Sequence, residues 1–273
     1  MRFGARADEA AAARRRDILF GVGQGALFAA VALAVLYIAF GTGGFRRPHA
    51  PAPRPVAVAA GLPASAPAIE RHLDFGSVSA PADVTRVAAW AVREADNGDR
   101  PFAVVDKRRA QVYVFEPGGR LIGTSPVLLG YASGDYTVAG VGNKAIEDIK
   151  PSERTTPAGR FQSEPGRNAE GKEVVWVDYA AAVSMHRVIN DNPRERRLQR
   201  LATPTPADNR ISWGCINVPV DFFEKTVWPH IGQRRGVVYV LPERRALTAF
   251  FPAAAAPQYL AQASGGQGNS AKP

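Results

Sequence analysis

The sequence predicts a mainly β, α+β fold: an antiparallel, β-sandwich-like domain with short helices, preceded by one N-terminal transmembrane helix. Three observations lead to this prediction. Short apolar runs separated by tight turns fill the second half of the chain, a long apolar run covers residues 18–40, and a Pro- and Ala-rich stretch covers residues 41–82. The predicted parts are a basic cytoplasmic segment (1–17), a transmembrane anchor (18–40), an extended linker (41–82), a folded domain (83–245) and a disordered tail (246–273).

The apolar run of residues 18–40 has Gln24 as its one strongly polar member and is long enough to cross a bilayer as a helix. Five arginines precede it, including Arg14, Arg15 and Arg16, and three follow it (Arg46, Arg47 and Arg54), so the positive-inside rule places the N-terminus in the cytoplasm. We therefore expect a single-pass inner-membrane protein with its folded domain in the periplasm. A cleaved signal peptide is the alternative, but the apolar run is too long for a signal core.

The folded domain begins with a helix over residues 83–97, where Asp83 can cap the start and Asn97-Gly98 supplies a stop. Consecutive short strands joined by tight turns then favour an antiparallel meander over βαβ crossovers. The expected strands are residues 102–106, 111–115, 121–129, 174–177, 182–186 and 237–241, with a strand entered at Phe161 and a helix from Pro219 to about residue 228. The Gly- and charge-rich segment 130–154 and the polar segment 187–211 are long loops, and we expect the first to be mobile.

Charge and composition exclude several function classes. The net charge of +9 is spread along the chain, and no nucleic-acid recognition motif is present. One cysteine and four histidines give no metal-ligand cluster, and nothing in the sequence implies a cofactor. A single cysteine in an exported protein cannot form an intrachain disulfide, so its thiol is a bystander, an intermolecular partner or a reactive group.

The single cysteine lies in the stretch Ser212-Trp213-Gly214-Cys215-Ile216-Asn217. A glycine before a thiolate nucleophile allows close approach of substrate and free backbone N–H groups for an oxyanion. A thiol of ordinary pKa also needs a base, and His186, after an apolar run, is the natural partner for Cys215. A buried cysteine acting as a small hydrophobe is the alternative.

Residues 101–242 together resemble the catalytic domain of the L,D-transpeptidases, the cysteine enzymes that cross-link bacterial peptidoglycan. The segment from Phe102 to Phe115 is similar to the family's opening hairpin, and Thr156-Pro157-Ala158-Gly159-Arg160-Phe161 to its Thr-Pro-x-Gly-x-Phe turn. His186 falls where the family's upstream histidine ends a strand, and Ser212, Gly214, Cys215 and Asn217 fit its Ser-His-Gly-Cys-x-Asn signature.

The sequence departs from the family pattern in two places. Trp213 replaces the histidine that normally stands two residues before the cysteine, and the separation between His186 and Cys215 is longer than usual. We interpret the loop 187–211 as an insertion. Trp213 is interpreted as a wall of the cleft, although its presence is also compatible with a retired active site.

The resemblance implies a two-step acyl transfer on peptidoglycan stem peptides, with Cys215 as nucleophile and His186 as base. The N–H groups of Gly214 and Cys215 would bind the oxyanion, and carbapenem-type compounds would acylate the thiol. Candidate substrate-binding residues are Trp213, Ser212, Arg187, Arg210 and Tyr131, of which the last three could contact stem-peptide carboxylates. A related hydrolase of wall peptides and a catalytically silent peptidoglycan-binding module remain alternatives.

Overall fold

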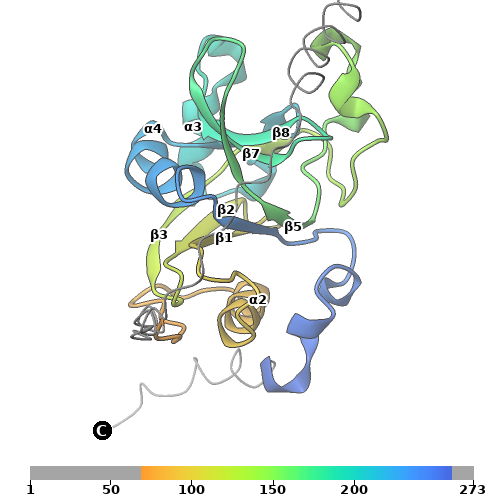
Figure 1. The fold of residues 1–273 in the computed structure, drawn as a ribbon. Coiled ribbons are helices and arrows are strands. Elements are labelled where there is room, and N and C mark those ends of the chain that lie inside the picture. The colour runs from red at the N-terminus through yellow and green to blue at the C-terminus, as the bar shows by residue number, and fades with distance from the viewer. Residues whose placement is uncertain (1–68, 260–273) are drawn as a thin grey trace, which may run out of the picture. The chain divides into compact units, whose positions relative to one another are not determined.

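A computed structural model describes residues 69–259 of the chain (Figure 1). The predicted basic segment, anchor and most of the predicted linker lie outside these residues. No helix within residues 69–259 combines the length and the apolar character needed to cross a membrane. The α+β class is confirmed, because the described part of the chain contains several sheets and few, short helices.

The first element is helix α2 (Ala82–Arg93), which carries apolar residues on one face at helical spacing. Its buried residues are Val84, Val87, Ala88, Ala89, Ala91 and Val92. The helix ends earlier than the sequence predicts, and Ala95 just beyond it has a left-handed backbone with φ of 54°.

A five-stranded sheet follows, in the order β3-β2-β1-β11-β5. Its strands are β1 (Phe102–Asp106), β2 (Gln111–Phe115), β3 (Leu121–Pro126), β5 (Gly159–Gln162) and β11 (Val237–Val240). Neighbours are antiparallel except for β1 and β11, which run parallel with Phe102 opposite Val237. The predicted antiparallel order therefore holds for the hairpins but not for this central pair. Turn chemistry specifies only neighbours joined by short loops, whereas β11 reaches β1 from the far end of the domain.

A second sheet of four strands has the order β10-β8-β7-β6. Its strands are β6 (Glu164–Arg167), β7 (Glu173–Asp178), β8 (Val183–Arg187) and β10 (Ile216–Val218), and β8 and β10 are again parallel. Strand β6 escapes prediction because it contains Pro165 and Gly166, which its position at the edge of the sheet tolerates. A short parallel pair joins β4 (Leu129–Gly130) to β9 (Arg210–Ser212).

The remaining elements are short helical turns. They are η1 (Val141–Asn143), η2 (Ile146–Asp148), η3 (Pro151–Glu153), η4 (Pro193–Glu195), α3 (Arg197–Ala202), η5 (Pro206–Asn209), α4 (Val220–Phe222), the π-helical η6 (Phe223–Gly232), η7 (Leu247–Ala249) and η8 (Ala253–Ala255). Pro219 precedes α4, and the expected helix after the cysteine is formed by α4 and η6 together.

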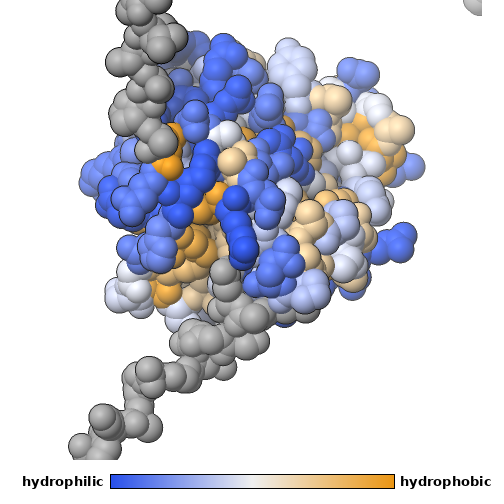
Figure 2. Space-filling view, turned by 60° about the horizontal axis from the view of Figure 1, so that its bottom comes forward, coloured by the Kyte–Doolittle hydropathy of each residue, from blue (hydrophilic) through white to orange (hydrophobic). Residues whose placement is uncertain are grey.

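The two faces of the five-stranded sheet bury different apolar clusters, as the period of two along a strand requires. Ala103 and Val105 of β1 face the second sheet and η6, whereas Phe102 and Val104 face α2. Figure 1 shows this layering, with α2 on one side of β1 and β2 and the sheet of β7 and β8 on the other. The face of the molecule in Figure 2 is mostly hydrophilic, with its hydrophobic residues in scattered groups.

Both ends of the described chain belong to this core, which corrects two predicted boundaries. Phe251 and Tyr259 are 2% and 1% exposed, and Leu247, Phe251 and Ala254 belong to the cluster around α2, so residues 246–259 are folded and not a disordered tail. Leu73 and Phe75, from the predicted linker, also pack against this cluster. Their aromatic and aliphatic side chains bury against the sheet, which composition alone does not reveal.

Candidate active site

The parallel pairing of β8 and β10 brings the cysteine and the histidine to one edge of the second sheet. In this pairing Met185 lies opposite Ile216 and His186 opposite Asn217, so Cys215 enters the site just before β10 begins. Ser184 and His186 share one face of β8 because side chains alternate along a strand. The Cys215 Sγ atom lies 3.5 Å from the Ser184 backbone N and 3.6 Å from its Oγ atom.

The loop before Cys215 is held by its own hydrogen bonds and by the turn at Thr156. Ser212 Oγ donates to the Cys215 carbonyl at 2.6 Å, and the Gly214 N–H donates to Ser212 Oγ at 3.2 Å. Thr156 Oγ1 donates to the Gly214 carbonyl at 2.7 Å and accepts from the Gly130 N–H at 2.9 Å. Gly214 has φ of 131°, which a side chain would strain, so glycine is required at this position.

The tautomer of His186 is fixed, with its lone pair on Nε2. Its Nδ1 atom lies 2.7 Å from the Arg187 carbonyl oxygen, which can only accept, so Nδ1 carries the proton. Burial lowers the pKa of the His186 imidazole, but the neighbouring Cys215 sulfur and the Arg187 carbonyl outweigh burial and raise this pKa above its ordinary value. The net effect favours the protonated imidazole when Cys215 is a thiolate.

The thiol of Cys215 is shifted in the complementary direction. Burial raises the pKa of the Cys215 thiol, but the neighbouring His186 imidazole and the two donors of Ser184 outweigh burial. The pKa of the thiol is therefore lower than usual, which is the property expected of a reactive rather than a structural cysteine.

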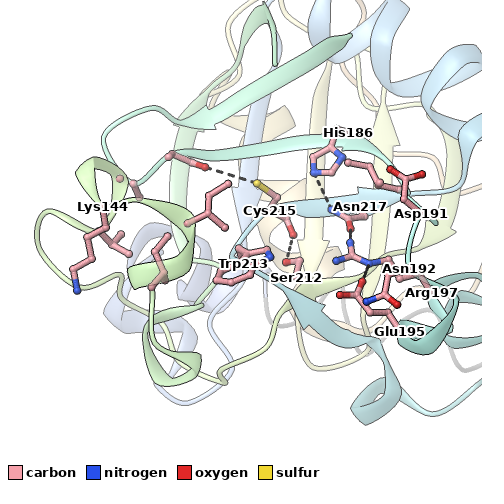
Figure 3. Close-up of a pocket in the computed structure, with 17 residues that line it drawn as sticks. Lys144, His186, Asp191, Asn192, Glu195, Arg197, Ser212, Trp213, Cys215 and Asn217 are labelled. Carbon is pink, nitrogen blue, oxygen red and sulfur yellow. Dashed lines mark hydrogen bonds and ion pairs between the residues drawn. The ribbon is translucent and has the colours of Figure 1, made fainter. Parts of the chain in front are cut away.

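Cys215 lies on the wall of a cleft of about 510 Å³ (Figure 3). One side of the cleft is mainly apolar and comes from Val141, Ile146 and Ile149 in the segment 141–149, which also contributes Lys144. The other side is polar and comes from the loop that the sequence identifies as an insertion; it contributes Asp191, Asn192, Glu195 and Arg197. The polar segments 130–154 and 187–211 thus face each other across Cys215.

The structure brings some of the predicted substrate-binding residues to this cleft and not others. Trp213 and Ser212 line it, and Trp213 is 37% exposed, whereas Ser212 is buried and serves the loop. Arg187, Arg210 and Tyr131 do not line it in the part of the chain that the structure describes.

The charges of the two arginines are satisfied elsewhere. Arg187 pairs with Glu173 and Glu224, and Arg210 pairs with Glu243. Tyr131 is 54% exposed outside the cleft. Neither guanidinium is therefore available to a carboxylate bound at Cys215 without breaking an ion pair.

Three residues at the site escaped prediction as functional residues. Ser184 could have been found from its place two residues before His186 on the same strand. Thr156 belongs to the turn motif, but its contact with Gly214 is tertiary. Arg197, whose Nη1 atom donates to Asn217 Oδ1 at 2.7 Å, carries no signal in the sequence because the insertion contains several arginines. Asn217, which belongs to the cysteine motif in the sequence, turns its side chain to His186.

No protein-family model and no curated protein matches the sequence. Solved structures similar to this chain include an Enterococcus faecium L,D-transpeptidase, at 16% identity and a TM-score of 0.31, covering 52% of this chain and 50% of that chain. A helical cell shape determining protein from Campylobacter jejuni is similar at 15% identity and a TM-score of 0.35, covering 57% of this chain and 55% of that one. The catalytic domain of the E. faecium L,D-transpeptidase is similar at 17% identity and a TM-score of 0.30, covering 52% of this chain and 98% of that one.

This chain spans about half the length of the first two of these proteins. L,D-transpeptidases, the family that the Cys215 and Thr156 motifs of this chain resemble, are among the solved structures to which it is similar.

Proposed function

We propose that this chain is a cysteine L,D-transpeptidase that acts on peptidoglycan stem peptides through a thioester at Cys215. The observation that carries the proposal is the pair of Cys215 and His186 in one cleft, with the His186 Nδ1 proton held by the Arg187 carbonyl. This arrangement puts the lone pair of His186 on Nε2, the nitrogen that takes the thiol proton in nucleophilic catalysis by cysteine. The lowered pKa of the thiol supports the same assignment.

In the first half-reaction, the Cys215 thiolate attacks the carbonyl carbon of the amide bond between the third residue of a donor stem, such as diaminopimelate, and a terminal D-alanine. His186 Nε2 takes the thiol proton and then gives it to the nitrogen of the leaving D-alanine. The C–N bond breaks, and the donor stem is left as a thioester on Cys215.

In the second half-reaction, a side-chain amine of another stem attacks the thioester carbon and passes a proton to His186 Nε2. The C–S bond breaks, and the new amide links the two stems. Water in place of the amine would give a hydrolase that trims stem peptides. Both outcomes use the same nucleophile and base, so the acceptor distinguishes them.

The oxyanion of each tetrahedral intermediate requires a donor beside Cys215. The family resemblance of the sequence implies that the N–H groups of Gly214 and Cys215 take this role. Because the Gly214 N–H already donates to Ser212 Oγ, we assign the oxyanion to the Cys215 N–H. Thr156 supports this donor by holding the peptide group between Gly214 and Cys215 through the Gly214 carbonyl.

The proposal is tested by intact-mass measurement of the full-length chain after exposure to a carbapenem, with Cys215→Ala as the control. We expect one adduct per chain in the wild type and none in the variant, because Cys215 is the one cysteine of the chain. Absence of an adduct at every pH between 6 and 9 contradicts an activated nucleophile and favours a silent wall-binding module.

Incubation with purified muropeptides then separates transfer from hydrolysis. New dimers together with released D-alanine are expected from a transpeptidase. Shortened monomers without dimers would replace the proposed transfer by hydrolysis at the same site. In either case Cys215→Ala is expected to abolish the products.

We also propose that residues 18–40 anchor the chain in the inner membrane with the folded domain in the periplasm, where peptidoglycan lies. The apolar run and the arginines before it support this topology. The test is protease treatment of spheroplasts: the domain is expected to be digested from outside, and its survival until the cells are lysed would contradict the topology.

A further inference from the structure

Asn217 links the catalytic histidine to a buried arginine from the inserted loop. The Asn217 Nδ2 atom lies 3.0 Å from His186 Nε2, and its Oδ1 atom lies 2.7 Å from Arg197 Nη1. Asn217 is fully buried and Arg197 is 8% exposed. Figure 3 shows these side chains as one row that runs from His186 through Asn217 and Arg197 to Glu195. The Glu195 carboxylate accepts a hydrogen bond from Arg197 Nε.

The donors and acceptors of this row can be assigned from chemistry alone. A guanidinium has only donors, so the Asn217 atom that faces Arg197 must be the carbonyl oxygen. The amide nitrogen of Asn217 then faces His186 and can only donate. Because Nδ1 of His186 donates to the Arg187 carbonyl, its Nε2 atom is the acceptor of the Asn217 N–H. The lone pair that must take the thiol proton is therefore already engaged by Asn217.

We propose that Arg197 is a positioning residue that fixes the orientation of the Asn217 carboxamide and thereby limits proton transfer from Cys215 to His186 in the resting protein. The inference rests on the proposed roles of Cys215 and His186. If the carboxamide turned over, its oxygen would accept from a protonated Nε2 and stabilise the imidazolium. Arg197 prevents this turn, because it would then face the two amide protons of Asn217 with donors of its own.

The charged groups around His186 either change the stability of its imidazolium or are paired with other residues. The positive charge of Arg197 itself opposes protonation of His186, whereas the Cys215 thiolate favours it. Glu195 is paired with Arg197, and Arg187, on the same strand as His186, is paired with Glu173 and Glu224. Asp191 lines the same cleft as His186. Removing Arg197 therefore releases both a hydrogen-bonding and an electrostatic restraint on the imidazolium.

The test is the rate of alkylation of the full-length chain by iodoacetamide between pH 5 and pH 10, which reports the thiolate of its one cysteine. Arg197→Met is expected to lower the midpoint of the pH profile by about one pH unit, roughly the effect of one hydrogen bond that favours one protonation state. Arg197→Lys, which keeps a donor and a charge, is expected to restore the profile toward that of the wild type.

The matched control is Arg200→Met, on the same helix. Arg200 donates to the carbonyls of Glu195 and Asp208 and holds the inserted loop without touching Asn217. The Arg200→Met variant is expected to leave the midpoint of the alkylation profile unchanged. Equal shifts for Arg197→Met and Arg200→Met would reduce Arg197 to a structural role and overturn the inference.

The ¹⁵N shifts of the His186 imidazole in the wild type provide a readout that does not depend on a variant folding. We expect a protonated Nδ1 and an unprotonated Nε2 at pH 8, and a proton on Nε2 would overturn the inference. His186→Ala separates the two proposals. If it leaves the alkylation profile unchanged, the nucleophile–base pair and the proposed function fail; if it shifts the profile and Arg197→Met does not, only the role of Arg197 fails.

Discussion

The guanidinium of Arg154 stacks on the indole of Trp213, with its Cζ atom 3.4 Å from the centre of the ring. Arg154 also donates to the Ile149 carbonyl through Nε and Nη2, so it ties the segment 141–149 to the residue two places before the nucleophile. Trp213 thus lines the cleft and, through Arg154, also holds the end of the segment 141–149, which forms the apolar side of the cleft.

Trp213→Ala is expected to remove a cation–π contact that contributes on the order of 1 kcal/mol at such a site and to loosen the segment 141–149. Hydrogen exchange should become faster at the backbone amides of this segment, while the rest of the domain is unaffected. Tyr179→Ala, which removes another exposed aromatic ring, serves as the control. Unchanged exchange in the Trp213 variant would show that Gly142, packed against the Ala180 carbonyl, holds the segment without the indole.

Ser184→Ala should raise the pKa of the Cys215 thiol toward its ordinary value, because the Ser184 hydroxyl is one of the groups that lower it. The pH profile of alkylation is then expected to move to higher pH, by less than in His186→Ala, because the Ser184 N–H remains. Alkylation should be slower at pH 7 and unchanged at a pH above both thiol pKa values. Ser163→Ala, a buried serine bonded to Ile231 and Gly236 away from the cleft, should leave the profile unmoved.

A profile for Ser184→Ala that coincides with that of the wild type would assign the lowered thiol pKa to His186 alone. A profile that moves to lower pH would contradict the hydrogen bond between the hydroxyl and the thiolate.

Local sequence signals predicted the parts of the fold that depend on near neighbours. The short apolar runs at β1 and β2 predicted two neighbouring strands, which form a hairpin. The turn motif at Thr156 predicted the start of β5. The parallel pairs β1–β11 and β8–β10 join segments separated by long stretches of chain, and no local pattern specifies such pairings.

The residues of the candidate site differ in the same way in how far the sequence indicates them. Cys215 and His186 stand out as scarce, reactive residue types, and the structure places both in one cleft. Arg197 is one of many arginines in the sequence, and only tertiary structure buries it against Asn217. Arg187 and Arg210 had the same appearance in the sequence, but glutamates from other elements pair with them.

Thr156→Val is expected to lower both stability and acylation, because it removes a hydroxyl that serves two buried backbone groups. The Gly130 N–H and the Gly214 carbonyl would lose a partner, at a cost of roughly 1–3 kcal/mol in the free energy of unfolding. Loosening Gly214 also displaces the Cys215 N–H, so carbapenem acylation should slow at a temperature where the variant is fully folded. Thr155→Val, at the adjacent buried position, is the control for the loss of a hydroxyl. Acylation at the wild-type rate in the folded variant would mean that the turn at Thr156 does not set the geometry of the nucleophile.

The carboxylate of Asp135 predicts how the stability of the domain depends on pH. It accepts hydrogen bonds from Lys107 Nζ at 3.0 Å and from the backbone N–H groups of Glu243 at 2.7 Å, Arg244 at 3.0 Å and Arg245 at 2.7 Å. Burial raises the pKa of Asp135, but these bonds outweigh burial and hold it below its ordinary value. The carboxylate therefore contributes stability at any pH above the pKa of the unfolded chain, and this contribution is lost as the pH falls through the lower pKa of the folded protein.

Asp135→Asn is accordingly expected to lower the free energy of unfolding at pH 7 by roughly 3 kcal/mol, since it leaves Lys107 buried with only the more distant Glu243 carboxylate, at 3.7 Å, as its counter-charge. Urea unfolding measured from pH 7 down to pH 3 should show a gap between wild type and variant that is constant near neutrality and narrows in acid, as the wild type loses the contribution of Asp135. Asp99→Asn, which removes an exposed partner of Arg71, should change stability little at any of these pH values. A gap that stays constant down to pH 3 would contradict the depressed pKa of Asp135 and leave the acid sensitivity of the domain to its other carboxylates.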